Sequence, residues 1–448
     1  MFNLVKRSIA ASLFVFSASC ASHSPIILDG GSYTVKEVSE DLETFVEFIK
    51  TTHPDITYTA NLANIDAMAD HIEQSFHDGM STREAWSAMA RMNPVFKDAH
   101  VGLRRPLAKI AEYESNGGKL FPVTVIIDNS GTIRLAESEL ESIGIKHGDE
   151  LLSINGIKAD AILETLAPRM RGNSAALGRL IMERYFAQYF WTIYGGYDQY
   201  VVRVRSGEHV RTITLPSNIS ASRGEKTPFA FKKLTNNIAY IDVSTFDISE
   251  KDRFQSFLAN AFAQISANGI DTLLIDLRKN GGGAHDVSDM LMIYLTSKPY
   301  SSISRVKARI TPENINRIPG AKLGAVVELP FEQIIKPPKT LPNRFEGNVY
   351  TLIGGLTYSQ AIAFSSTLQD YKIATIIGEE TEGPANQTGQ VQSLKLPNTG
   401  FEVLAPIYIF TRKSGDVSNR GVIPDVTIKN TPLDSNESIS TFLKMLEN

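Results

Sequence analysis

The clearest alternation of apolar and polar positions lies near the middle of the chain. An unbroken apolar run, Thr272 to Ile275, is typical of a buried strand, and a polar, glycine-rich run, Asp276 to Gly283, follows it. Apolar residues then recur at helical spacing from His285 to Thr296. The pattern predicts a strand, a glycine turn and a helix start, where uncovered backbone N–H groups can hold a bound anion or a transient oxyanion.

A second strand-to-helix turn is predicted downstream. Val349 to Ile353 is apolar, Gly354 and Gly355 interrupt the run, and a helix begins at about Tyr358. Ser359 therefore falls at or near the first helical turn, where serine is a preferred N-cap residue. Taken alone, this turn favours a capping role for Ser359.

The N-terminal region shows three amphipathic helical patterns between residues 35 and 92. The first should end at His53-Pro54, because proline cannot continue a helix. The third opens at Thr82, which is predicted as its cap. Residues 35–107 are therefore expected to form a helical domain.

Residues 118–216 combine strand patterns with a longer helical stretch. The segment GIKHGDELLSING, residues 144–156, joins a glycine turn, a buried strand and an Asn-Gly turn, and it resembles the signature of PDZ domains. A closing hairpin is predicted over residues 200–215. The aromatic stretch 167–197 is predicted as a helical insertion into this PDZ-like domain.

Composition excludes some functions. The formal net charge of −4 leaves no basic surface of the kind that nucleic-acid binding needs, so no nucleic-acid partner is expected. The glycine turn lacks the G-x-G-x-x-G spacing of dinucleotide sites, and no HExxH or other cluster suggests a metal. We therefore expect neither a cofactor nor a metal.

The first twenty residues have the pattern of an export signal. Lys6 and Arg7 precede a short, mostly apolar stretch, residues 8–19, that is too short to span a bilayer. The single cysteine, Cys20, follows directly, as in a bacterial lipoprotein signal whose cysteine is lipidated. Cleavage after a small residue such as Ala21 is the alternative, and both predict a periplasmic or outer-membrane-anchored protein of the cell envelope. No cysteine pair is available for a disulfide.

Taken together, the two turns resemble the C-terminal-processing and tricorn-type serine peptidases. The resemblance rests on DLRKNGGG at residues 276–283, on Ser359 in the position of the family nucleophile, and on the ATIIGEET run at residues 374–381. It implies a multidomain α/β protein with an N-terminal helical region, a PDZ-like module and a crotonase- or ClpP-like peptidase core. We place the core at residues 228–430, after a polar linker at residues 217–227, and a terminal tail helix within 431–448.

The resemblance allows two general bases. The C-terminal-processing branch uses a lysine, but Pro384 stands at that position, and Lys395 lies too far along the chain. The tricorn-type branch uses a histidine from the N-terminal part, and His100 in the segment DAHVG matches it. A neutral imidazole suits a base near neutral pH, with activity rising through about pH 6 to 7. His285, beside the glycine turn, is the alternative base.

The remaining members of the site are implied by the same resemblance. Tricorn-type enzymes carry a glutamate shortly before a Gly-Val-x-Pro-Asp segment, here residues 421–425, and Ser418 occupies its position. Asp416, Glu380 and Glu382 are alternative acids. The oxyanion would be held by the amide of Gln360 and by that of Gly282 or Gly283.

These features predict an exported serine endopeptidase that cleaves peptides or unfolded proteins through an acyl-enzyme, with the PDZ-like domain binding substrate. The displaced acid leaves open a second hypothesis, a catalytically inactive peptidase-like scaffold that binds peptides. Hydrolysis of a small ester or amide is a third. The nucleophile, base and glycine turn occurring together favour the enzyme.

Overall fold

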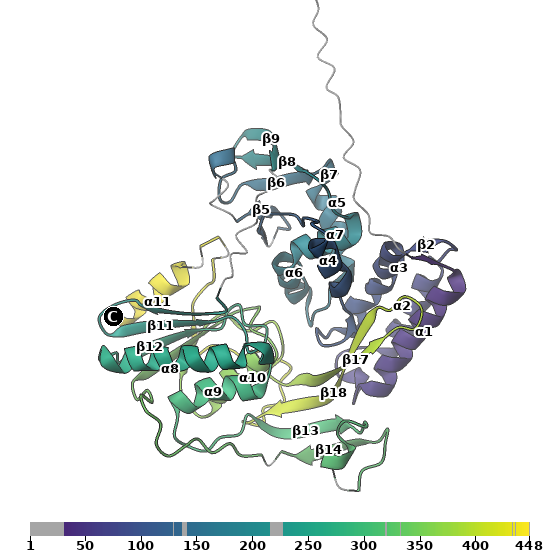
Figure 1. Ribbon diagram of the computed structural model, residues 1–448. Helices are drawn as coiled ribbons and strands as arrows, with labels where there is room; N and C mark the ends of the chain where they lie inside the picture. The colour runs from purple at the N-terminus through teal and green to yellow at the C-terminus, as the bar shows by residue number, and fades with distance from the viewer. Residues whose placement is uncertain are drawn as a thin grey trace, which may run out of the picture.

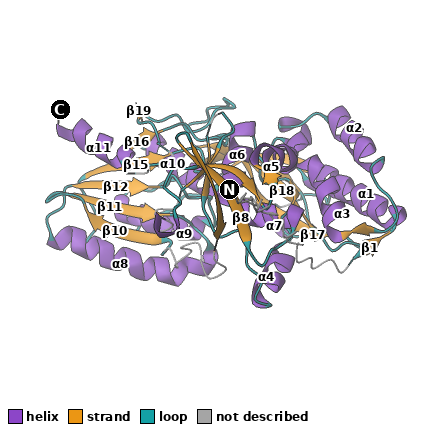
Figure 2. Ribbon diagram, turned by 90° about the horizontal axis from the view of Figure 1, so that it is seen from above, coloured by secondary structure: helices purple, strands orange, loops and turns teal. Residues whose placement is uncertain are grey.

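The computed structural model describes residues 31–128, 130–136, 141–215, 227–318, 320–331, 333–431, 433–434 and 436–447. The predicted export signal lies outside the described residues, as does nearly all of the predicted linker. The molecule is elongated, with the parallel sheet of the core at one end and the N-terminal helices at the other (Figure 2). Within the described residues, no helix is both long and apolar enough to cross a membrane.

The N-terminal region is helical, as the amphipathic patterns predict. Its elements are β1 (Ser32–Tyr33), α1 (Val35–Thr52), η1 (Ile56–Tyr58), α2 (Leu62–Glu73), β2 (Met80–Ser81), α3 (Thr82–Met89) and η2 (Ala90–Phe96). Helix α1 ends at its C-cap His53, which confirms the predicted end. The predicted cap of α3 is wrong by one residue: Ser81 caps it, in a capping box with Glu84, and Thr82 is the first helical residue.

An antiparallel sheet with helices packed against it follows. The strands run in the order β4 (Val125–Ile127), β5 (Ile133–Leu135), β6 (Glu150–Ile154), β8 (Tyr200–Ser206) and β9 (His209–Leu215), and β7 (Ile157–Lys158) pairs with β6. Helices α4 (Leu107–Ser115), α5 (Ala159–Leu166), α6 (Ala175–Arg184) and α7 (Phe186–Tyr194) complete this part. Helices α6 and α7 confirm the predicted helical stretch. Most aromatic residues of α7 are buried, and Phe190 stacks on Phe186 and contacts Tyr200 of β8.

The core sheet has the order β10 (Phe229–Lys233), β11 (Ile238–Val243), β12 (Thr272–Asp276), β15 (Asn348–Ile353), β16 (Thr375–Gly378) and β19 (Val426–Thr427). From β11 onward its strands are parallel. Helices α8 (Lys251–Ala267), α9 (His285–Leu295) and α10 (Gln360–Asp370) cover one face and α11 (Glu437–Glu447) covers the other (Figure 1). Parallel strands are buried on both faces, which explains why β12 and β15 read as unbroken apolar runs.

A third sheet, which the sequence did not predict, links the core to the N-terminal helices. Its order is β14 (Val326–Pro330), β13 (Ile303–Arg309), β18 (Glu402–Arg412) and β17 (Gln387–Lys395), and β3 (Gly102–Leu103) pairs with β18. The β17–β18 hairpin extends from the core to α1 (Figure 1). There the buried carboxylate of Asp41 accepts hydrogen bonds from the backbone N–H groups of Asn398 and Thr399.

Candidate active site

The two predicted turns lie side by side. They follow β12 and β15, which are parallel neighbours, so both turns emerge at the same edge of the sheet. Gly282 has φ +100°, and a Cβ atom there would stand 2.6 Å from Ser359 Cβ and 2.8 Å from the Gln360 nitrogen. Only a glycine lets the first turn approach the second this closely.

Ser359 occupies the N-cap position of α10, but its side chain makes no capping hydrogen bond. Its backbone has φ 53° and ψ −125°, which is rarely found for a residue with a side chain. Its Oγ instead lies 3.0 Å from Nε2 of His100. The capping role that the turn alone favours is therefore not the one that its hydroxyl takes.

His100 reaches Ser359 through the third sheet. It lies two residues before β3, which pairs with β18, and β18 in turn pairs with β17. The imidazole Nδ1 lies 3.0 Å from the Thr388 hydroxyl of β17. That hydroxyl donates to Asp98 Oδ2 at 2.7 Å, and the other oxygen of Asp98 accepts the backbone N–H of His100 at 2.8 Å. A continuous chain of contacts thus runs from Ser359 to a buried carboxylate.

The surroundings of His100 favour its neutral form. Its side chain is 11% exposed. The ring of Tyr358 packs on the imidazole with centroids 4.9 Å apart. Burial lowers the pKa of His100 below its usual value of 6.5, Asp98 opposes that shift, and Arg171 adds to it. At neutral pH the imidazole is therefore unprotonated at one nitrogen, as a general base must be.

Each of the two turns contains an amide that is free to hold an oxyanion. The Gly282 amide donates to the side-chain oxygen of Asn280 at 2.8 Å, so it is already occupied. Among the described residues, the amides of Gly283 and Gln360 have no hydrogen-bond acceptor. Of the two glycines predicted as oxyanion donors, Gly283 has the free amide. Gly282 instead lets the glycine turn pack closely against Ser359. The Gln360 side chain donates to Ser288 and takes no part in this arrangement.

The predicted acids lie elsewhere. Ser418 donates to Asp416 on an exposed loop. Glu380 forms an ion pair with Arg420, whose hydrogen bonds lower the pKa of that carboxyl. Glu382 accepts a hydrogen bond from Ser174 at 2.7 Å. None of these side chains contacts His100, and Glu380 and Glu382 line a polar pocket instead.

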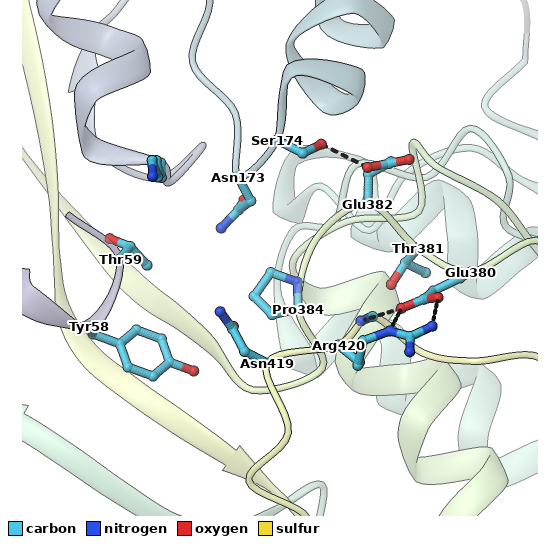
Figure 3. Close-up of a pocket in the computed structure, with 12 residues that line it drawn as sticks. Tyr58, Thr59, Asn173, Ser174, Glu380, Thr381, Glu382, Pro384, Asn419 and Arg420 are labelled. Atoms are coloured by element: carbon cyan, nitrogen blue, oxygen red, sulfur yellow. Dashed lines mark hydrogen bonds and ion pairs between the residues drawn. The ribbon is translucent and has the colours of Figure 1, made fainter.

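This pocket has a volume of about 500 Å³ and opens between the N-terminal region, α6 and two loops of the core. Figure 3 shows two pairs of side chains along the wall of this pocket, Glu380 with Arg420 and Glu382 with Ser174. Pro384, at the position of the family lysine, also lines it. The pocket adjoins the site through Asn173, whose side-chain oxygen accepts the Tyr358 hydroxyl at 2.8 Å.

The other candidate bases do not reach Ser359. His285 is 63% exposed and pairs with its neighbour Asp286 at 2.8 Å. Lys395 lies exposed at the end of β17. In the part of the chain that the structure describes, no group of histidine, cysteine and acidic side chains could hold a metal ion.

Two contacts of His100 were missed by the sequence analysis. Asp98 stood in the DAHVG segment but was given no role; its position two residues before the histidine was a usable signal. Thr388 gave none, because its contact with His100 joins positions 288 residues apart. Only the pairing of β3, β18 and β17 brings it there.

The fold is that of known serine peptidases. The structure of mature CPAF complexed with lactacystin aligns with 92% of this chain and 98% of its own, at 16% identity and a TM-score of 0.67. The photosystem II D1 C-terminal processing protease aligns with 90% of this chain and 96% of its own, at 16% identity and a TM-score of 0.51. The expected multidomain α/β architecture is thus shared with structures of this class.

The sequence itself supplies the family. Residues 237–428, which include both turns, match the model of peptidase family S41. This match covers the core of the chain, and together with the shared fold it makes the protein a serine-type peptidase, a hydrolase that acts on peptides or proteins. The resemblance found in the two turns is confirmed.

Proposed function

We propose that this peptidase works by a serine–histidine mechanism, with Ser359 as nucleophile and His100 as general base. One observation carries the proposal: Oγ of Ser359 lies 3.0 Å from Nε2 of His100. This distance is within the reach that proton transfer needs. The two side chains come from parts of the chain 259 positions apart, and the serine hydroxyl is not used for helix capping.

In the proposed mechanism, the Ser359 oxygen attacks the carbonyl carbon of the substrate while Nε2 of His100 takes its proton. The carbonyl oxygen becomes an oxyanion, which the amides of Gly283 and Gln360 stabilise; such a donor is worth about 3 kcal/mol of barrier. His100 then gives the proton to the leaving amine and the acyl-enzyme remains. Water, deprotonated by the same histidine, attacks the ester and frees Ser359.

The inactive-scaffold hypothesis predicts a different outcome. A scaffold has no need of a serine in a strained backbone whose hydroxyl makes no capping hydrogen bond and lies beside a neutral histidine. Such strain persists only where its surroundings enforce it.

The test is mass spectrometry of peptides and unfolded proteins after incubation with wild type, Ser359→Ala or His100→Gln. We expect cuts by wild type alone, with all three proteins equally folded. Equal cleavage by Ser359→Ala would remove the serine from its role, and no cleavage by any of them would favour the scaffold.

We further propose that residues 118–216 form a PDZ-like substrate-binding domain. The edge strand β9 supports this, because its outer side pairs with no other described strand and can accept an extended peptide. The opposite edge is less open, since Glu183 of α6 accepts the Ile127 amide. Binding of peptides with free or amidated C-termini to the Ser359→Ala protein tests this. A domain that captures chain ends should prefer the free carboxylate.

Export to the cell envelope with a lipid anchor at Cys20 remains a proposal that rests on the first twenty residues. Metabolic labelling with palmitate should mark the wild-type protein and not Cys20→Ser. If palmitate labels neither protein and the N-terminus is cleaved after Ala21, the result would favour a soluble periplasmic enzyme.

A further inference from the structure

His100 lacks the acid that the family resemblance implies. Ser418 stands at that position and its hydroxyl donates to Asp416 instead. A buried imidazole that takes a proton from Ser359 becomes a cation, and a nearby negative charge is needed to stabilise it. Within the described residues, the one carboxylate in contact with the imidazole is that of Asp98, whose Oδ1 lies 3.7 Å from Nδ1.

We propose that Asp98 acts on His100 through the hydroxyl of Thr388, which makes Thr388 a positioning residue for the general base. The inference rests on the proposed function, in which Ser359 and His100 are the reacting pair. The Thr388 hydroxyl lies 2.7 Å from Asp98 Oδ2 and 3.0 Å from His100 Nδ1. Asp98 is 1% exposed and Thr388 is 3% exposed, so bulk water does not compete for these contacts.

The chain of hydrogen bonds has only one possible direction. An ionised carboxylate only accepts, so the Thr388 O–H must donate to Asp98. The lone pairs of the same oxygen then face Nδ1 of His100, which must carry a proton to make the contact. Nε2 is left with a lone pair toward Ser359, which is the tautomer that a general base requires.

The surrounding contacts hold this chain in place. Asp98 Oδ1 accepts the backbone N–H of His100 at 2.8 Å and lies 3.5 Å from the Tyr358 hydroxyl. Arg171 is the other charged neighbour of the imidazole, and it donates to the carbonyl of Ala99. During catalysis the proton of Ser359 moves to Nε2 and Nδ1 keeps its own. The imidazolium charge is balanced by Asp98 across the hydroxyl, and no proton moves through Thr388.

The first test is Asp98→Asn, which should reverse the chain. The backbone N–H of His100 can only donate, so it holds the amide oxygen of Asn and turns the amide NH₂ toward Thr388. The NH₂ then donates to the Thr388 oxygen, whose own proton must go to Nδ1, and the imidazole proton moves to Nε2. We expect kcat to fall between about 100-fold and 10,000-fold with KM little changed.

The second test removes the hydroxyl and then restores it. Thr388→Val keeps the shape of the side chain but leaves Nδ1 without an acceptor, and we expect kcat to fall about 10-fold to 100-fold. Thr388→Ser should return to within a few-fold of wild type. Thr192→Val is the matched control: Thr192 is also 3% exposed, but its hydroxyl donates to the carbonyl of Gln188 in α7.

Nitrogen NMR of histidine-labelled protein reads the tautomer without any substrate. Wild type and Thr388→Ser should carry the His100 proton on Nδ1, and Asp98→Asn should carry it on Nε2. An unchanged tautomer in Asp98→Asn, or a Thr388→Val enzyme as fast as Thr388→Ser, would overturn the proposal. A wild-type protein that cuts no peptide while its tautomer still reverses in Asp98→Asn would defeat the proposed peptidase mechanism and leave the Asp98–Thr388 arrangement standing.

Discussion

Ser359 has a backbone conformation that is costly for any residue with a side chain, at φ 53° and ψ −125°. Strain of this kind costs about 1–3 kcal/mol and persists only when the surrounding structure enforces it. Here Gln387 donates to the Ser359 carbonyl at 2.8 Å, and the glycine turn packs against its Cβ. The result is a hydroxyl directed at His100 and not back into its own helix.

Gly282 is the residue on which this packing depends. We expect Gly282→Ala to lower kcat by about 100-fold, because its new Cβ would stand 2.6 Å from Ser359 Cβ and displace the proposed nucleophile. Gly281→Ala is the matched control, since a Cβ there meets nothing within 4 Å and the residue has no positive φ. Steady-state kinetics on a cleaved peptide measures both. If both substitutions lowered kcat equally, the turn would matter for its flexibility and not for its close packing against Ser359.

The pKa of His100 predicts how activity depends on pH. In the proposed mechanism the unprotonated imidazole is the active form, and burial holds its pKa below 6.5 despite the opposing effect of Asp98. The acid limb of kcat/KM should therefore lie below pH 6.5, in the lower half of the range of about pH 6 to 7 that the sequence suggests or beneath it. A pH profile from about 4 to 9 measures this. An acid limb above pH 6.5 would contradict the lowered pKa of the buried His100.

The β17–β18 hairpin is the element that connects His100, which comes from the N-terminal part of the chain, with the core that carries Ser359. One end of β17 carries Thr388, and the turn between the two strands docks on α1 through Asp41. Asp41 is fully buried, and it accepts hydrogen bonds from two backbone N–H groups and from the Thr399 hydroxyl. A buried carboxylate is tolerated here because nearly all of its acceptor positions are used.

Removing this anchor should destabilise the protein. We expect Asp41→Ala to lower the free energy of unfolding by about 2–4 kcal/mol, because it leaves the partly buried N–H groups of Asn398 and Thr399 without their acceptor. Glu43→Ala, on the exposed side of the same helix, should change it by less than about 0.5 kcal/mol. Urea denaturation compares the two. A similar effect of both substitutions would mean that the hairpin is held by its apolar contacts alone.

At the scale of the whole molecule, stability should depend on pH through His53. This residue is 1% exposed, and its Nδ1 accepts the Asp55 amide at 3.0 Å. Burial lowers the pKa of His53 to about 4, although Asp98 and Asp55 oppose the shift. Protonation therefore favours the unfolded chain, where the pKa is near 6.5, and stability falls as the pH drops from 6.5 toward 4.

We expect His53 to account for a loss of about 2 kcal/mol of unfolding free energy between pH 7 and pH 5. His53→Gln should remove this part of the pH dependence, because glutamine does not titrate. His71→Gln is the control, since His71 is exposed on α2. Denaturation curves at both pH values measure the effect. The same pH dependence in wild type and His53→Gln would show that other groups cause it.

The amino-acid sequence by itself determined the local parts of the site. Apolar runs flanked by glycines identified β12 and β15, and their helical continuations identified α9 and α10. Neighbouring parallel strands place the turns that follow them at one edge of a sheet, so Ser359 and the glycine turn could be expected together. These features are encoded within short segments, where periodicity and turn residues act directly.

Only the tertiary structure decided which groups surround His100. The partners Thr388 and Asp98 lie 290 positions apart in the chain, and no spacing or motif relates them. Their meeting depends on the register in which β3, β18 and β17 pair, and a shift by one residue would turn Thr388 to the other face. Likewise Asp416 and Glu380 have the right chemistry for an acid, but Ser418 and Arg420 satisfy them away from the imidazole. Sequence thus specified the serine turn and the glycine turn, whereas long-range strand pairing selected the partners of His100.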